Sequence, residues 1–225
     1  METNDLTGFY NETLFFSEKN NVTIKETDKG ATVKSATINC QNADFDYSTE
    51  DIWSAGDNLY RKESEGYKFR RKCDGFLICR TENKNYLIWI ELKSGFSEVF
   101  NKAIYQLSAC YVKMKSYLRT ISTYKAEDFE EIAIVVSHPE DDKSQSIEEN
   151  DSVLSRRNTL VSEETPSDKC RRRYRETGTI TIDAADFDSG KLHLVSDILP
   201  HNLRVFHIPT ETEQANIDLK LLFQN

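Results

Sequence analysis

The sequence predicts an α/β fold, a mixed β-sheet flanked by helices, and three features of its central region predict it. Two largely apolar runs, 76–79 and 86–93, are separated by a short polar turn and predict an antiparallel hairpin. Apolar residues then recur at steps of three and four over 96–119, which predicts an amphipathic helix. The apolar run 132–136 predicts a buried strand after that helix.

The N-terminal part is patterned less clearly. The sequence predicts a short helix over 5–19 and strands over 22–26 and 31–40, the second from its alternation of residue types. A polar connection over 41–47 then leads to a helix predicted over 49–64.

Residues 139–169 contain nine acidic and four basic side chains and few apolar ones, which predicts a long mobile loop. After it, the sequence predicts strands over 178–182, 191–195 and 203–208, and a helix over 211–223. The expected organisation is therefore a core over 1–138, the acidic loop over 139–169, and a β-rich C-terminal extension over 170–225 packed on the core.

Composition excludes several classes of protein. The 225 residues include only eight Gly and four Pro but 24 aromatic residues, which excludes collagen-like and fully disordered chains. No apolar run approaches the roughly 20 residues that cross a bilayer, and the acidic N-terminus does not resemble a signal peptide. The five cysteines lack paired spacing and are interpreted as free thiols, so we expect a cytoplasmic protein without a membrane partner.

Charge is distributed unevenly along the chain. Residues 61–125 contain 14 Lys and Arg against six Asp and Glu, whereas the whole chain carries a net charge of −9. A basic central third in an acidic protein predicts either a patch for an anionic partner or charges that mix once the chain folds. The net acidity argues against indiscriminate binding to nucleic acid.

The main chemical signal lies in the strand predicted over 86–93. Glu91 and Lys93 interrupt its apolar run two residues apart, so their side chains point to the same face. Burying an acid and an amine is costly unless each is paired or acts on a ligand. Asp74 begins the preceding strand, where the hairpin would bring it beside Glu91.

Two adjacent carboxylates repel each other unless a divalent cation lies between them. Oxygen ligands of this kind suit Mg²⁺ or Mn²⁺ rather than zinc. Lys93 beside such a metal could orient or deprotonate an attacking water, or neutralise charge that develops on a phosphate. The alternative interpretation is an internal ion pair of Lys93 with Glu91 or Asp74 in a non-catalytic sheet.

Asp74, 16 intervening residues, then Glu91-Leu92-Lys93, followed by an amphipathic helix and a strand, resembles the PD-(D/E)xK nuclease superfamily. The resemblance covers residues 67–137 and implies a restriction-endonuclease-like fold. It also implies that Asp74, Glu91 and the carbonyl of Leu92 bind the metal, and that Lys93 is the catalytic lysine.

Three further details bear on this resemblance. Gln106 resembles the catalytic glutamine that some lineages of the superfamily place on the following helix. Cys73 stands where the family has a proline before the aspartate. Many members carry an additional acid on their first helix, and the candidates for it remain open: Glu12, Glu18, Asp51 and Asp57.

Basic residues near the motif predict a rim that binds nucleic acid. Arg70, Arg71 and Lys72 lead directly into Asp74, although they could equally form a solvated hairpin edge. Lys102 lies four residues before Gln106 on the predicted helix and could reach a phosphate. The basic cluster at 171–175 could contact phosphates or pair with the acidic loop.

The resemblance implies a Mg²⁺- or Mn²⁺-dependent nuclease, most simply a DNA endonuclease that leaves a 5′-phosphate and acts in restriction or antiviral defence. One alternative is RNA cleavage by the same site, because DNA and RNA present the same phosphates. The other is a catalytically silent nuclease-fold subunit that binds or scaffolds a larger complex. The expected partners are nucleic acid and a second copy of the chain or another protein.

Overall fold

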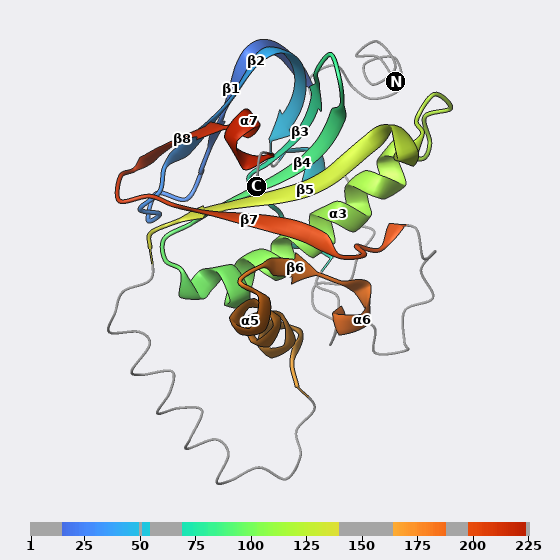
Figure 1. The fold of residues 1–225 in the computed structure, drawn as a ribbon. Coiled ribbons are helices and arrows are strands. Elements are labelled where there is room, and N and C mark those ends of the chain that lie inside the picture. The colour runs from blue at the N-terminus through green and yellow to red at the C-terminus, as the bar shows by residue number, and fades with distance from the viewer. Residues whose placement is uncertain (1–14, 50, 55–68, 140–163, 188–197, 224–225) are drawn as a thin grey trace, which may run out of the picture.

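The computed structural model describes residues 15–49, 51–54, 69–139, 164–187 and 198–223. These residues form a mixed eight-stranded sheet with helices on both faces (Figure 1), which confirms the α/β prediction. The strands are β1 (Phe16–Lys25), β2 (Ser35–Thr49), β3 (Gly75–Arg80), β4 (Asn85–Lys93), β5 (Phe129–Ser137), β6 (Ile180–Ile182), β7 (Leu203–Pro209) and β8 (Gln214–Asp218). The helices are α2 (Asp51–Ser54), α3 (Ile104–Leu118), α5 (Pro166–Thr177), α6 (Ala184–Phe187) and α7 (Leu219–Leu222), with a π-helical segment at Val99–Ala103 and a 3₁₀ turn at Ala126–Asp128.

The strands lie in the order β1-β2-β3-β4-β5-β7-β6, and β8 pairs with β2. Strands β4, β5 and β7 are parallel neighbours, whereas β1 to β4 pair antiparallel in succession. Strand β8 pairs with the first part of β2, and β3 pairs with its last part. The residues after 170 therefore supply strands to the same sheet as the central hairpin.

The central region forms as the sequence predicts. Strands β3 and β4 make an antiparallel hairpin in which Gly75 pairs with Ile90. The π-helical segment and α3 fall within the helix predicted over 96–119, and β5 contains the strand predicted over 132–136. Because β5 runs parallel to β4, the chain must cross from one end of the sheet to the other between them, and α3 makes that crossing (Figure 1).

Strand β4 is buried on both faces, which explains its nearly continuous apolar pattern. Leu87 and Trp89 belong to the core beneath α3, which also includes residues of α2, β6 and β7. Ile88 and Ile90 belong to a second core on the opposite face, which β1, β2, β8 and α7 cover. Glu91 and Lys93 share the face of Trp89 because strand side chains alternate.

Three N-terminal predictions need correction or fall partly outside the described residues. Of the helix predicted over 5–19, residues 5–14 lie outside the described part, and 16–19 belong to strand β1, where Phe16 pairs with Tyr47. The predicted connection at 41–47 belongs to β2, which buries Phe45 and Asp46. Cross-strand pairing decided both cases, because Asp46 is neutralised by Arg80 and is therefore tolerated in the sheet. Within the helix predicted over 49–64, the structure describes only α2 as helical.

The C-terminal predictions also differ in detail. The loop predicted over 139–169 lies outside the described residues from 140 to 163, but its end is helical because α5 begins at Pro166. Thr165 and Asp168 form a capping box there. The predicted strand at 191–195 lies outside the described residues. The prediction of a helix over 211–223 is wrong for residues 214–218, which form β8 because pairing with β2 overrides the local pattern. It is right for residues 219–222, which form α7.

All five cysteines are buried free thiols. No helix among the described residues is long and apolar enough to cross a membrane.

Candidate functional site

The candidate site lies at the end of the central hairpin. Asp74 directly precedes β3, and Glu91, Leu92 and Lys93 are the last residues of β4. Strands β5 and β7 run parallel to β4, so the carboxyl ends of three strands meet at this edge of the sheet. Open α/β sheets bind ligands at such edges.

Asp74 is held against the end of β4. Its carboxylate atom Oδ2 accepts a hydrogen bond of 2.6 Å from the backbone N–H of Leu92, and its side chain is buried. A hydrogen bond from an amide to a charged carboxylate is stronger than one between neutral groups. It therefore fixes the position of the Asp74 carboxylate relative to Glu91 and Lys93.

Glu91 and Lys93 form a buried ion pair between Oε1 and Nζ. The Lys93 ammonium also donates a hydrogen bond of 3.2 Å to the carbonyl oxygen of Leu92. The second carboxylate oxygen of Glu91, Oε2, is buried and has no hydrogen-bond partner among the described residues. Buried carboxylate oxygens are rarely left without a partner, so Oε2 is the atom of this site that most needs a cation or water.

The site is electrostatically strained. Burial raises the pKa of Glu91 well above its usual value, the charge of Asp74 raises it further, and the ammonium of Lys93 opposes both. Burial alone would lower the pKa of Lys93, but the negative charges of Glu91, Asp74 and Glu26 outweigh burial and raise it. Shifted pKa values in a buried group of neighbouring charges are typical of functional sites, although structural ion pairs also produce them.

Two further acids lie near Lys93, and sequence reasoning missed both. Glu26 follows β1, and its charge acts on Lys93. Glu98 accepts a hydrogen bond of 3.2 Å from the Ser94 N–H and forms an ion pair with Lys102. Burial opposes the shift, but Lys102, Ser94 and the charge of Lys93 together lower the pKa of Glu98. The spacing of Glu98 and Lys102 was a readable signal, whereas nothing in the sequence connects Glu26 to Lys93.

The segment that leads into Asp74 is held by α3 and α2. The Nε2 atom of Gln106 donates a hydrogen bond of 2.7 Å to the carbonyl oxygen of Lys72. The Cys73 N–H donates to Cys110 Sγ at 2.9 Å, and the Cys73 carbonyl accepts a hydrogen bond of 2.8 Å from Trp53 Nε1. Gln106 therefore acts on the backbone in this structure and positions the residues before Asp74.

Lys113 supports the same segment from the core. Its side chain is fully buried, and Nζ lies 3.4 Å from the carbonyl oxygen of Arg71 and 3.5 Å from that of Trp53. A buried ammonium that contacts two carbonyl oxygens ties α2 to the segment before Asp74. The helical pattern over 96–119 gave no signal for this role, because lysine at such a position is usually exposed.

The predicted nucleic-acid-binding residues lie in two places. Arg70, Arg71 and Lys72 are partly exposed just before Asp74, where Arg71 lies over the ring of Tyr105 at 5.2 Å. Lys72 donates a hydrogen bond of 2.7 Å to the Ser54 hydroxyl. Lys102 is exposed but paired with Glu98, which reduces its charge available for a phosphate.

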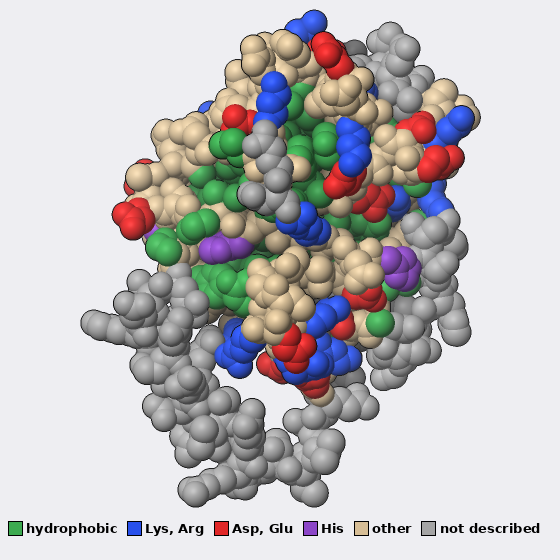
Figure 2. All heavy atoms as spheres, viewed as in Figure 1, with side chains coloured by type: hydrophobic (Ala, Val, Ile, Leu, Met, Phe, Trp, Pro, Cys, Tyr) green, Lys and Arg blue, Asp and Glu red, His purple; other side chains and the backbone are tan. Residues whose placement is uncertain are grey.

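The basic cluster at 171–175 lies on α5, and its arginines pair largely within the protein. Arg172 pairs with Glu164, and Arg173 pairs with Asp186. Arg171 lies 5.3 Å from the centre of the Phe100 ring. In Figure 2, basic and acidic side chains are accordingly intermixed over the α5 end of the molecule. Of the two expectations for this cluster, this arrangement favours ion pairing with acids of the protein over contact with phosphates.

The candidates for an additional acid are only partly resolved. Glu12 and Asp57 lie outside the described residues, and Asp51 begins α2 two residues after Thr49, which pairs with Gly75. Glu18 is excluded, because it pairs in register with Phe45 and through it with Cys79, five residues beyond Asp74 on β3.

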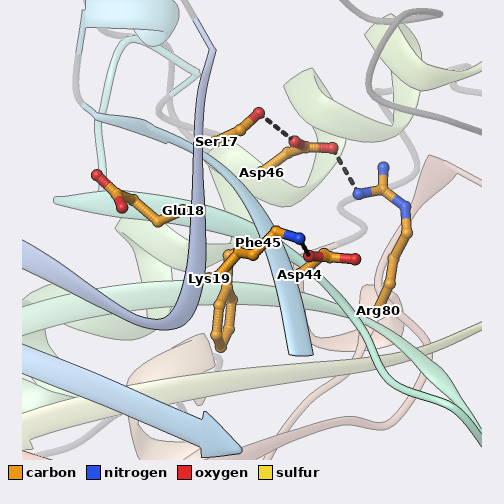
Figure 3. Close-up of a pocket in the computed structure, with 7 residues that line it drawn as sticks. All are labelled: Ser17, Glu18, Lys19, Asp44, Phe45, Asp46 and Arg80. Carbon is orange, nitrogen blue, oxygen red and sulfur yellow. Dashed lines mark hydrogen bonds and ion pairs between the residues drawn. The ribbon is translucent and has the colours of Figure 1, made fainter. Parts of the chain in front are cut away.

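Glu18 instead lines a separate surface cavity of about 590 Å³ (Figure 3), together with Ser17, Lys19, Asp44, Phe45, Asp46 and Arg80. In this cavity Asp46 accepts a hydrogen bond of 2.8 Å from the Ser17 hydroxyl and pairs with Arg80 at 2.6 Å. Lys19 and Asp44 form a second pair at 3.6 Å. Its charged groups largely neutralise one another, so it supports a ligand site less well than the hairpin end does.

The donor set at the hairpin end suits a hard divalent cation. Among the described residues, no three His, Cys, Asp and Glu side chains cluster as a metal centre. The groups at hand are the carboxylates of Asp74 and Glu91 and the carbonyl of Leu92, all oxygen donors of the kind that Mg²⁺ and Mn²⁺ prefer. The orphaned Oε2 atom of Glu91 is the structural feature that fits such a cation.

A hydrogen-bonded serine and histidine lie on the neighbouring strands. Ser137 pairs in register with Lys93, and its Oγ lies 2.8 Å from Nε2 of His207. Ser137 Oγ also donates to the carbonyl oxygen of His138 at 2.9 Å, so it accepts its second bond from His207. Burial lowers the pKa of His207 to about 4, which keeps the imidazole neutral. No spacing in the sequence had singled out this pair.

Comparison of the chain with protein-family models, with curated proteins and with solved structures found no match.

Proposed function

We propose that this chain is a metal-dependent phosphodiesterase that acts on nucleic acid, with a restriction-endonuclease-like core and DNA as the favoured substrate. The observation that carries the proposal is the buried group of Asp74, Glu91 and Lys93 at the carboxyl end of β4. Two neighbouring buried acids, of which Asp74 raises the pKa of Glu91, lower stability, and a protein tolerates that cost where the charges act on a ligand.

Two features of the fold support this proposal. The order of hairpin, helix α3 and parallel strand β5 is the order that the PD-(D/E)xK resemblance implies for residues 67–137. Arg71 and Lys72 lie two to three residues before Asp74 and are partly exposed, where they could hold the phosphates of a substrate. Charge-assisted contacts of this kind supply most non-specific affinity for nucleic acid.

In the proposed mechanism, Asp74, Glu91 and the Leu92 carbonyl would hold Mg²⁺ or Mn²⁺, which when bound supplies Lewis-acid activation of the attacked phosphate. The N–H of Leu92 keeps the Asp74 carboxylate oriented. Lys93 would orient the attacking water and stabilise the negative charge that develops on the phosphate oxygens. Gln106 and Lys113 position the backbone before Asp74 through its carbonyl groups.

The proposal is tested by cleavage assays on duplex DNA, single-stranded DNA and RNA, each with Mg²⁺, Mn²⁺ or EDTA. The proteins are the wild type, Lys93→Ala and Lys84→Met. Lys84 is a matched control because it also forms an ion pair, with Glu130, but lies directly before β4, at the end of the hairpin far from Asp74.

We expect the wild type and Lys84→Met to cleave at similar rates, EDTA to abolish cleavage, and Lys93→Ala to lower the rate about a hundredfold or more. Cleavage by Lys93→Ala at a rate close to that of the wild type would refute the assignment of the site. The substrate that is cleaved decides between DNA and RNA.

A second candidate function is a catalytically silent binding or scaffold subunit. The observation that favours it is the internal ion pair of Glu91 and Lys93, because such a pair can exist in a sheet without catalysis. This candidate predicts no cleavage on any substrate and no binding of Mn²⁺ by the wild type in calorimetry. Binding of Mn²⁺ that Asp74→Ala abolishes would exclude it in favour of a nuclease that needs a partner or activator.

A further inference from the structure

The Lys93 ammonium contacts two oxygen atoms at the end of β4. Nζ is ion-paired with Oε1 of Glu91 and lies 3.2 Å from the carbonyl oxygen of Leu92. These are two of the three oxygen groups that the proposed function assigns to the metal. The side chains are 10% and 0% exposed for Lys93 and Glu91, so solvent screens their contact weakly.

Two cations cannot share these oxygens at close range. The pair of buried acids needs a positive counter-charge, because an uncompensated buried charge strongly destabilises a protein. In this structure the charge comes from a side chain of the same strand, two residues from Glu91. Lysine suits this role, since its compact ammonium is carried on a flexible four-carbon stem that can swing away.

A displaced ammonium would also have acids to move towards. The charge of Glu26 acts on Lys93, and the charge of Lys93 acts on Glu98. Glu98 lies beside Ser94, the residue next to Lys93, through its hydrogen bond to the Ser94 N–H. Movement of Lys93 therefore need not leave its charge unpaired.

We propose that Lys93 is the resident counter-ion of the acid pair and that a divalent metal binds only by displacing its ammonium from Glu91 and Leu92. This inference rests on the proposed function, since it concerns the same site. It makes Lys93 the residue that sets metal affinity: the competition weakens metal binding and keeps the metal-free protein folded. It also places the released ammonium near the site, where the proposed mechanism requires it.

The test measures metal binding and stability rather than activity. Mn²⁺ binding is measured by isothermal titration calorimetry, and thermal unfolding is followed with and without Mn²⁺, for the wild type, Lys93→Met and Lys84→Met. Lys84→Met removes the same charge from an ion pair with Glu130 and controls for the change in net charge. Lys93→Gln, which keeps a hydrogen-bond donor for Glu91, serves as the second variant if Lys93→Met does not fold.

We expect Lys93→Met to bind Mn²⁺ about tenfold or more tightly than the wild type, and Lys84→Met to bind like the wild type. Without metal, Lys93→Met should melt at a lower temperature than the wild type. Mn²⁺ should raise the melting temperature of Lys93→Met by more than it raises that of the wild type. A merely structural lysine would lower the melting temperature equally with and without Mn²⁺, which would refute the inference.

The outcomes separate this inference from the proposed function. If the wild type binds Mn²⁺ and the Lys93 variants bind equally or more weakly, Lys93 does not compete with the metal, and the proposed site stands without this inference. If neither the wild type nor the Lys93 variants bind Mn²⁺, the metal site and the inference both fail.

Discussion

The Oδ2 atom of Asp74 accepts a hydrogen bond of 2.6 Å from the backbone N–H of Leu92. This bond joins the residue before β3 to the end of β4, and it sets the Asp74 carboxylate close enough to Glu91 for its charge to raise the pKa of Glu91. The same contact therefore orients one acid and strains the other. Asp74 therefore acts on the site in two ways, through its hydrogen bond and through its charge. Different substitutions can remove these two effects one at a time.

We predict that Asp74→Asn abolishes cleavage but leaves the free energy of unfolding within about 1 kcal/mol of the wild type, or raises it. The asparagine keeps an oxygen that accepts from the Leu92 N–H, and it removes the repulsion with Glu91. Asp74→Ala, in contrast, should lower the free energy of unfolding by about 1–3 kcal/mol, because it leaves the Leu92 N–H buried without an acceptor. Urea unfolding measures both variants.

The contrast between these variants distinguishes a functional acid from a structural one. A functional acid is held in place at a cost in stability, so removal of its charge alone should not unfold the protein. Destabilisation by Asp74→Asn as large as that by Asp74→Ala would mean that the charge itself holds the hairpin end together.

Gly75 fixes how closely β1 approaches the site. A Cβ atom at residue 75 would lie 2.7 Å from Cδ1 of Ile24 and 2.9 Å from its Cγ1. We predict that Gly75→Ala lowers the free energy of unfolding by about 1–3 kcal/mol, as overpacking of a core does. Ile24→Ala removes the clashing atoms. Gly75→Ala should therefore lower the free energy of unfolding by less in the Ile24→Ala background than in the wild type.

Urea unfolding of the two single variants and the double variant gives the coupling between Gly75 and Ile24. A favourable coupling confirms that β1 packs against the residue after Asp74. Simple additivity of the two changes would contradict that close approach.

The sequence was most informative where local pattern and tertiary environment agree. Strand β4 could be predicted because burial on both faces requires a continuous apolar run, against which Glu91 and Lys93 stand out. Its pairing with β3 followed from the short polar turn between them. The helix predicted over 96–119 followed from its apolar stripe, and only its π-helical first turn could not be predicted.

The rest depended on contacts between distant segments. Asp44 and Asp46 made 41–47 resemble a connection, yet β2 continues through them because Lys19 and Arg80 pair with these acids. The register of β1 and β2 shifts at Lys19–Asn21, and Asn20 and Asn42 there adopt left-handed backbone conformations. The influence of Glu26 on Lys93 depends on this folding of β1, so no sequence spacing could reveal it.

Lys113 offers a test of how the segment before Asp74 is supported. We predict that Lys113→Met lowers the free energy of unfolding by about 1–3 kcal/mol and also lowers the cleavage rate, because the carbonyl oxygens of Arg71 and Trp53 lose a donor. The loss of activity should appear at temperatures where the variant is fully folded. Urea unfolding and initial cleavage rates on one protein preparation measure the two effects.

Lys115 provides the matched control on the same helix. It is also buried, but it pairs with Glu131 and donates a hydrogen bond of 3.0 Å to the Tyr124 hydroxyl, away from the site. Lys115→Met should therefore destabilise the protein to a similar extent without changing the cleavage rate of the folded protein. Equal losses of activity in both variants would mean that Lys113 acts only through global stability.

The hydrogen bond between buried Ser137 and partly buried His207 predicts how stability depends on pH. Burial lowers the pKa of His207 to about 4 in the folded protein, below the usual value of 6.5 that applies when the chain is unfolded. Between these values the unfolded chain binds more protons, so the free energy of unfolding falls as the pH falls from about 6.5 towards 4. This pKa shift can lower the free energy of unfolding by at most about 3 kcal/mol, reached when His207 is fully protonated in the unfolded chain.

The physical reason is the geometry of the imidazole. Nε2–H is already committed to the Ser137 hydroxyl, so protonation adds a charge at Nδ1 of a partly buried imidazole, whose ring centre lies 4.9 Å from that of Phe96. We predict that His207→Gln, which keeps a donor for Ser137, removes most of the fall in stability between pH 6.5 and 4. His201→Gln, at an exposed histidine, should leave that fall unchanged. Urea unfolding at pH 7.5, 5.5 and 4.5 measures the slopes, and an equal slope in His207→Gln and the wild type would assign the pH dependence to other groups.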